Sequence, residues 1–144
     1  MSSAEIQACL ANKKRVETRV DFSANFRELL SLASKQYGTK VAINFFEQGN
    51  GVELTFVELA NRVNMLADGL SHKGITKGKH VAVMLSNRIE YPISWLAIAV
   101  LGAVMVPVNV NYTALELDYL LNDSDTDFII TEPVFLPIFT AMKQ

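Results

Sequence analysis

Apolar residues between Asn25 and Tyr37 recur at the three- and four-residue spacing of an amphipathic helix. Gly38 follows and is placed to end that helix, because glycine readily adopts the conformation that closes a last helical turn. Residues 41–45 and 52–56 then alternate apolar and polar side chains, with the sequence Gln-Gly-Asn-Gly between them at residues 48–51. Period-two alternation around turn residues predicts a β-hairpin.

A capping box, Thr55-Phe-Val-Glu58, is expected to open a second helix. We expect this helix to stop before Gly74 and to place His72 in its last turn, where positive charge suits the helix dipole. That role is favoured over a catalytic one for His72. The apolar stripe expected to be buried contains Phe56, Leu59, Ala60, Val63, Leu66, Ala67 and Leu70.

From residue 80 onward, strand patterns alternate with helix patterns. Asn87 is the predicted N-cap of the first of these helices, with Glu90 three residues on. Alternation of this kind implies a parallel sheet. The predicted fold class is α/β, a doubly wound parallel sheet over residues 80–144 preceded by a helix, a β-hairpin and a helix. The expected elements are strand 80–85, helix 88–102, strand 104–108, helix 113–122, strand 127–131 and a last helix that starts at Pro133.

The uncharged segment from Tyr91 to Val110 is long enough to cross a bilayer, which raises the alternative of a membrane anchor. Pro107 cannot lie deep in a continuing helix, and residues 104–108 are mostly β-formers. We therefore interpret the segment as a helix of about 15 residues that ends near Gly102, followed by a strand. Such a helix would be about 22 Å long, short of the roughly 30 Å hydrocarbon core of a bilayer.

Hydrophobic content, net charge and cysteine count exclude several classes of function. The chain has 144 residues, of which 50% are hydrophobic, so it can bury a substantial core. Its net charge of −2 gives no electrostatic basis for nucleic-acid binding. The single cysteine, Cys9, cannot form an internal disulfide, and a cytoplasmic location fits. Residues 1–22 are polar and without a sustained period, so we expect a loosely ordered lead-in to a folded unit of residues 23–144.

Candidate chemistry is sparse. Doubly wound folds bind ligands beyond the carboxyl ends of their strands, but the turn Leu85-Ser-Asn-Arg88 has no glycine and predicts no phosphate loop. Arg88 is interpreted as a surface residue and His80 as a structural one. Two widely spaced histidines and an aspartate-rich turn at residues 118–127 match neither a catalytic triad nor a calcium loop. From the residues alone we assign no catalytic, cofactor-binding or metal-binding residue.

Three blocks of sequence resemble the N-terminal region of the adenylate-forming (AMP-binding) superfamily, of the acyl-CoA synthetase/ligase type. Residues 54–64, LTFVELANRVN, are similar to that family's T-Y-x-E-L…A-N-R pattern. Residues 74–90, GITKGKHVAVMLSNRIE, are similar to G-V-x-x-G-D-x-V-A-x-x-L-x-N-x-x-E. Residues 101–109, LGAVMVPVN, with residues 115–124, LELDYLLNDS, resemble G-A-x-x-V-P-x-N…E-L-x-Y-x-L-x-D-S. The blocks follow one another in unbroken order over residues 25–135.

The resemblance implies a ligase that joins a fatty or aromatic acid to coenzyme A through an acyl-adenylate, using ATP and Mg²⁺. The family's phosphate loop, adenine and Mg²⁺ motifs, hinge and C-terminal catalytic lysine do not occur in these 144 residues. We therefore expect a truncated N-terminal part that is inactive alone, has the remainder of the ligase chain as its partner, and self-associates. The alternative from another class is a stand-alone, non-catalytic flavodoxin-like binding or regulatory module.

Overall fold

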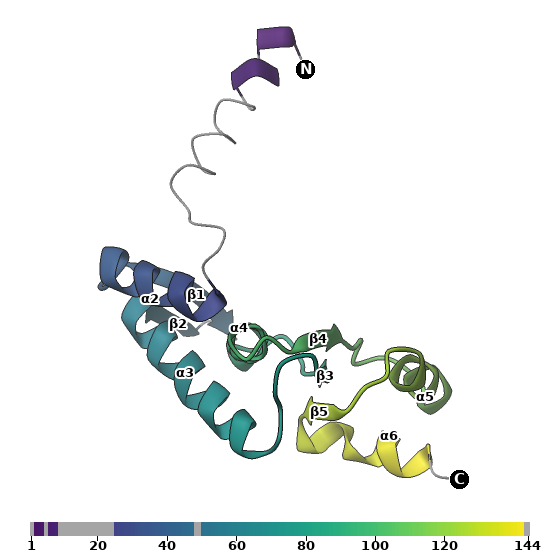
Figure 1. The fold of residues 1–144 in the computed structure, drawn as a ribbon. Coiled ribbons are helices and arrows are strands. Elements are labelled where there is room, and N and C mark those ends of the chain that lie inside the picture. The colour runs from purple at the N-terminus through teal and green to yellow at the C-terminus, as the bar shows by residue number, and fades with distance from the viewer. Residues whose placement is uncertain (1, 5, 9–24, 48–49, 143–144) are drawn as a thin grey trace.

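A computed structural model of the chain describes residues 2–4, 6–8, 25–47 and 50–142 (Figure 1). Cys9 and most of the predicted lead-in of residues 1–22 lie outside the described residues. The elements in chain order are α2 (Phe26–Tyr37), β1 (Val41–Glu47), β2 (Asn50–Thr55), α3 (Phe56–His72), β3 (His80–Met84), α4 (Glu90–Val100), β4 (Val104–Pro107), α5 (Ala114–Asp123), β5 (Phe128–Thr131), the 3-10 helix η1 (Pro133–Phe135) and α6 (Leu136–Ala141). The predicted α/β order is confirmed.

Local capping chemistry fixes where helices α2 and α3 begin. The Asn25 side chain accepts a hydrogen bond from the Glu28 backbone N–H at the start of α2. Thr55 and Glu58 form the predicted capping box, in which the Thr55 N–H donates to Glu58 Oε2 over 2.9 Å. Between these helices, β1 and β2 pair antiparallel, as the alternating pattern predicted.

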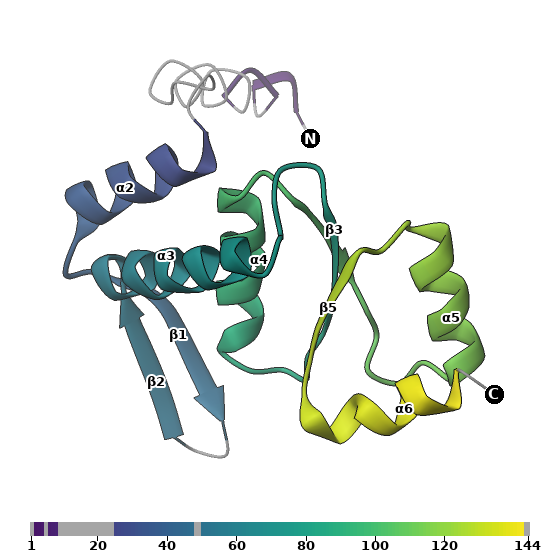
Figure 2. The ribbon, with the colours of Figure 1, turned by 60° about the horizontal axis from the view of Figure 1, so that its bottom comes forward.

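Helix α3 lies across the hairpin and reaches α4 (Figure 2). Four residues of its predicted stripe are buried there, namely Leu59, Ala60, Val63 and Ala67. The stripe residues Phe56, Leu66 and Leu70 are only half-buried. In α2 only Leu30 is buried, because a single side of that helix meets the rest of the molecule.

The parallel sheet has the strand order β4-β3-β5, so the first of its three strands along the chain is central. Alternate residues of β3 point to opposite faces. Val81 and Val83 pack with Ile98 of α4, and Met84 packs with Leu117 of α5 on the other face. Both faces are therefore covered, which confirms the doubly wound arrangement.

The apolar segment of residues 91–110 folds as a helix, a turn and a strand. Helix α4 ends at Val100, and Gly102 then adopts a φ of 68°, a left-handed conformation that favours glycine because it has no Cβ. The expected helix of residues 88–102 is shorter in the structure, and the prediction of Asn87 as its N-cap is wrong: Ile89 is the N-cap and makes no side-chain cap bond. No helix within the described ranges has the length and apolarity needed to cross a membrane.

The end of the described chain also differs from the expected single helix. Pro133 opens the short 3-10 turn η1, and the α-helix proper begins only at Leu136. Both lie on the sheet face that α5 covers, because Phe135, Ile138 and Phe139 pack with the cluster around Leu117.

Candidate functional site

The carboxyl ends of β3 and β5 form the point in the sheet where ligands bind in doubly wound folds. The chain leaves β3 through α4, on one face of the sheet, and leaves β5 through η1 and α6, on the other. Neighbouring strands whose connections diverge in this way leave a crevice beyond their carboxyl ends. The strand ends are held in register by the pairing of Met84 with Thr131, whose hydroxyl also donates to the Met84 carbonyl over 3.1 Å.

A carboxylate of the chain itself lies beyond these strand ends. Glu132 directly follows β5, and its Oε1 accepts hydrogen bonds from the Ser86 backbone N–H at 2.6 Å and the Ser86 hydroxyl at 2.7 Å. Its Oε2 accepts a third from Arg88 Nη1 at 2.9 Å. The Glu132 side chain is only 14% exposed. All three donors are groups that bind oxyanions, so the site has the chemistry of an anion-binding crevice that is already occupied.

The hydrogen bonds of this cluster favour the charged forms of both Glu132 and Arg88. The hydrogen bond from the Ser86 backbone N–H, followed by that from its hydroxyl, lowers the pKa of Glu132 below its usual value. Arg88 Nε also donates to Glu90 at 2.6 Å, and this bond, followed by the one to Glu132, raises the pKa of Arg88. The guanidinium therefore stays charged and is held by two carboxylates.

The sequence interpretation of this turn needs correction. Arg88 is more than a surface residue, since it joins the turn to Glu90 and to Glu132. These contacts hold residues 86–88 against the end of β5, so α4 begins only at Glu90 and Asn87 does not cap it. Glu132 was missed because its partners lie 44 and 46 residues earlier. One sequence signal pointed to Glu132: it directly follows a predicted strand, and that strand lies next to β3 in the sheet.

The other candidate residues lie apart from this crevice and have structural partners. His72 Nδ1 is 2.7 Å from the Asp68 carbonyl at the end of α3. His80 Nδ1 is 2.6 Å from the Ser124 carbonyl at the opposite, amino end of β3. Asp127 accepts from Lys79 Nζ at 2.8 Å and from the His80 backbone N–H at 2.9 Å, which lowers its pKa. These contacts are those of residues that hold elements together.

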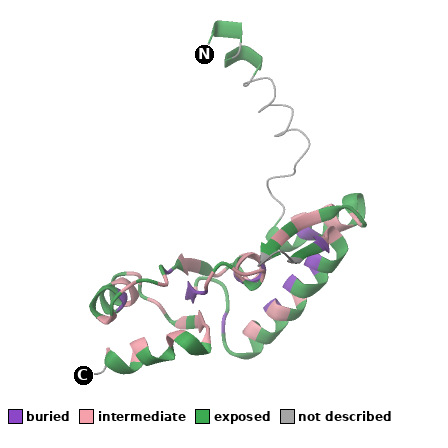
Figure 3. Ribbon diagram, turned by 180° about the vertical axis from the view of Figure 1, so that it is seen from behind, coloured by how far each residue is buried: buried purple, intermediate pink, exposed green. Residues whose placement is uncertain are grey.

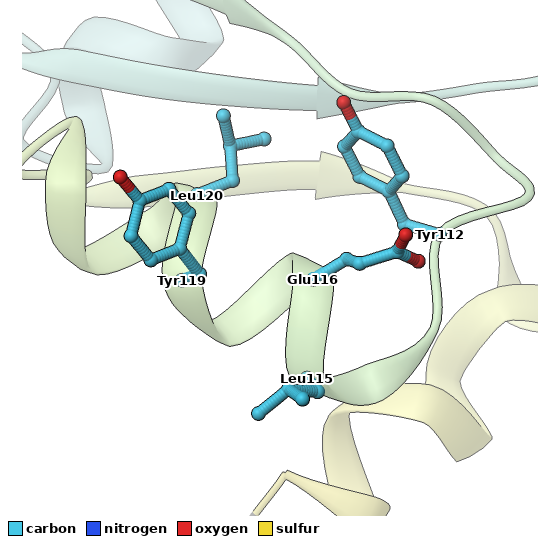
Figure 4. A pocket seen from close by; sticks show the side chains of 5 residues that line it. All are labelled: Tyr112, Leu115, Glu116, Tyr119 and Leu120. Atoms are coloured by element: carbon cyan, nitrogen blue, oxygen red, sulfur yellow. The ribbon is translucent and has the colours of Figure 1, made fainter.

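A second surface feature is an apolar hollow of about 570 Å³ beside α5. Tyr112 comes from the loop before the helix, and the remaining lining residues come from the helix itself (Figure 4). Leu115 is 81% exposed and Tyr119 is 69% exposed. The hollow carries one carboxylate, that of Glu116, whose pKa is lowered because it accepts the Thr113 backbone N–H in the capping box at the start of α5. It therefore offers apolar contact area rather than reactive groups.

Comparison with known proteins places this fold among CoA ligases and adenylation domains. The chain is 30% identical over 122 residues to a crotonobetaine/carnitine–CoA ligase from Salmonella typhi, and 32% identical over 119 residues to one from Proteus mirabilis. These alignments cover 83% and 82% of this chain but 23% of each relative. The chain thus spans about a quarter of the length of the curated relatives it matches.

The solved structures that resemble this chain are also CoA ligases and adenylation domains. A long-chain-fatty-acid–CoA ligase from Archaeoglobus fulgidus matches with a TM-score of 0.74 and 28% identity, over 83% of this chain and 25% of that one. An artificially fused adenylation–PCP di-domain from Klebsiella oxytoca matches with a TM-score of 0.69 and 29% identity, over 76% of this chain and 20% of that one. The sequence model described as "AMP-binding enzyme" matches residues 30–143. By this match the chain belongs to the AMP-binding enzyme family, and it corresponds to the N-terminal region of that family's members.

Proposed function

We propose that this chain is the N-terminal part of an ATP-dependent acyl-CoA ligase. The observation that carries the proposal is the family match over residues 30–143, together with curated relatives that are CoA ligases. In the proposed reaction a carboxylate oxygen attacks the α-phosphorus of ATP, and pyrophosphate leaves. The thiolate sulfur of coenzyme A then attacks the carbonyl carbon of the acyl-adenylate, and AMP leaves with the bonding electrons.

Two observations support a nucleotide and metal site outside the described residues. The anion donors at the carboxyl end of β3 already hold Glu132. Within the described ranges, no group of three or more His, Cys, Asp or Glu residues is placed to hold a metal ion. We therefore propose that ATP, Mg²⁺ and coenzyme A bind to ligase sequence outside these 144 residues, and that the 144-residue chain alone forms no adenylate. This occupied crevice also gives no support to the alternative of a flavodoxin-like binding module.

Pyrophosphate release tests the proposal in two arms. The 144-residue chain is incubated with ATP, Mg²⁺ and a panel of carboxylic acids that includes long-chain fatty acids, aromatic acids, crotonobetaine and carnitine, and we expect no pyrophosphate. The same panel is given to the longer polypeptide read from the source gene, where one acid should release pyrophosphate and, with coenzyme A present, yield a thioester. Pyrophosphate from the short chain would refute its inactivity, and a longer polypeptide inert toward the whole panel would refute the ligase assignment.

The partner in this proposal is the remainder of the ligase chain, which packs on the apolar face of α5, η1 and α6. Figure 3 shows how much of these elements is exposed. Besides Leu115 and Tyr119 of α5, Val134 of η1 is 68% exposed and Leu136 of α6 is 54% exposed, and we propose that these residues form one contact face. Apolar surface of this kind marks contact with other protein, and relatives about four times as long supply the segment to cover it. We propose a cytoplasmic location, with which the single cysteine of these 144 residues is compatible.

When the remainder is not supplied, the same face should associate with itself. Size-exclusion chromatography with light scattering over a range of concentrations measures this directly. Leu115→Lys places a charge on the face and should shift the population toward monomer. Met65→Lys is the matched control, because Met65 is 75% exposed on α3, outside the face. A wild-type chain that stays monomeric at high concentration, or an equal effect of the two variants, would contradict the proposed surface.

A further inference from the structure

The donors at the carboxyl end of β3 are also positioned by contacts other than those to Glu132. We call the Ser86 backbone N–H, the Ser86 hydroxyl and Arg88 Nη1 the oxyanion cradle. Ser86 lies two residues past the end of β3, whose residues 81–84 are fully buried and whose two edges are paired with β4 and β5. Arg88 is held independently, because its Nε donates to Glu90 at 2.6 Å. Met84 and Thr131 keep the two strand ends together without help from Glu132.

The cradle also has the composition of an oxyanion site. A backbone N–H and a hydroxyl converge on one oxygen, and a guanidinium N–H binds the other, so both oxygens of the carboxylate are bound. Charge-assisted bonds of this kind are the strong ones, and Arg is the cation best suited to a planar carboxylate. Partial burial of the carboxylate strengthens each of these bonds relative to bulk water.

We propose that this cradle is a carboxylate-binding site at the sheet's ligand crevice, that Glu132 is its built-in occupant, and that a free carboxylate binds there once Glu132 is removed. Glu132 is tethered beside the cradle, so its binding is intramolecular and is favoured over that of a dissolved anion. In the wild-type chain the site is therefore closed to anions, nucleotide phosphates included. This inference rests on the geometry of the crevice and holds whether or not the proposed ligase function does.

Chemical rescue tests the proposal. Glu132→Ala leaves the three donors without their carboxylate, and its thermal unfolding midpoint is measured at low protein concentration while sodium acetate replaces sodium chloride at constant ionic strength. We expect acetate to raise the midpoint of Glu132→Ala by about 3 °C and to leave the wild type unchanged. If Glu132→Ala is unfolded in chloride, the same exchange is followed as recovery of far-UV ellipticity, and no recovery in acetate overturns the proposal.

Two controls separate cradle binding from a general salt effect. Arg88→Ala/Glu132→Ala removes the cation of the cradle and should lose the acetate response. Glu90→Ala leaves Glu132 in place and should show no response. An equal acetate effect in the double variant, or the absence of any effect in a folded Glu132→Ala, overturns the proposal. Phosphate is the comparison anion, and stabilisation by phosphate but not by acetate would overturn the assignment of the site to carboxylates.

Discussion

Leu117 packs α5 against the sheet, and truncating its side chain should lower the free energy of unfolding substantially. It is the one residue of α5 that is buried, at 0% exposed, where it packs with Ala82 and Met84. Leu117→Ala removes three carbon groups from this contact. At about 0.8 kcal/mol for each buried group the transfer loss is about 2.4 kcal/mol, and the cavity left behind adds to it.

We expect a loss of about 3 kcal/mol in the free energy of unfolding, because half-buried Leu120 and Leu121 can relax into part of the space. Urea unfolding followed by far-UV circular dichroism gives this value, measured at two low protein concentrations so that association does not contribute. Leu115→Ala is the matched control on the same helix, and its exposed side chain should contribute less than about 0.5 kcal/mol. Equal stabilities of the two variants with an unchanged urea slope would refute the packing argument.

Three further predictions concern a cap, a turn and a carboxylate. Thr113→Ala removes the hydroxyl that caps α5 and should lower the free energy of urea unfolding by about 1 kcal/mol, with an unaltered value counting against the cap. Gly102→Ala forces a Cβ into a φ of 68° and to 3.3 Å from Lys77 Cγ, so the thermal midpoint should fall, and a rise would show that the turn tolerates a side chain. The lowered pKa of Glu132 stabilises the fold above the unfolded pKa, and this contribution is lost as pH falls through the folded pKa. Urea midpoints should therefore be flat near neutrality and fall with acidification, and in Glu132→Gln the fall should be smaller; an equal fall in both would contradict the linkage.

Elements whose signals are local could be predicted from the sequence. The capping boxes at Thr55 and Thr113 each join residues three positions apart, and both are formed. The strand predicted over residues 80–85 forms as β3, and its residues Val81 and Met84 are fully buried. The turn at Gly102 followed from glycine and the nearby proline.

Features that depend on contacts distant in sequence could not be predicted in the same way. Asn87 is a good N-cap in isolation, but the turn that contains it is held by Glu132, more than 40 residues later. The strand order that brings β5 beside β3 had to be known before that contact could be foreseen. The candidate site was missed for this reason, because its donors follow β3 and its acceptor follows β5, and these strands become neighbours only in the folded sheet.

The central position of β3 has a consequence for synthesis on the ribosome. Strand β3 is made before either of its neighbours, and 47 residues separate Met84 from its β5 partner Thr131. At a translation rate of roughly 10 residues per second, a strand whose backbone pairs on both sides waits about 5 seconds for its second neighbour. During that interval the edge of β3 that will pair with β5 is open to chaperones and to other nascent chains.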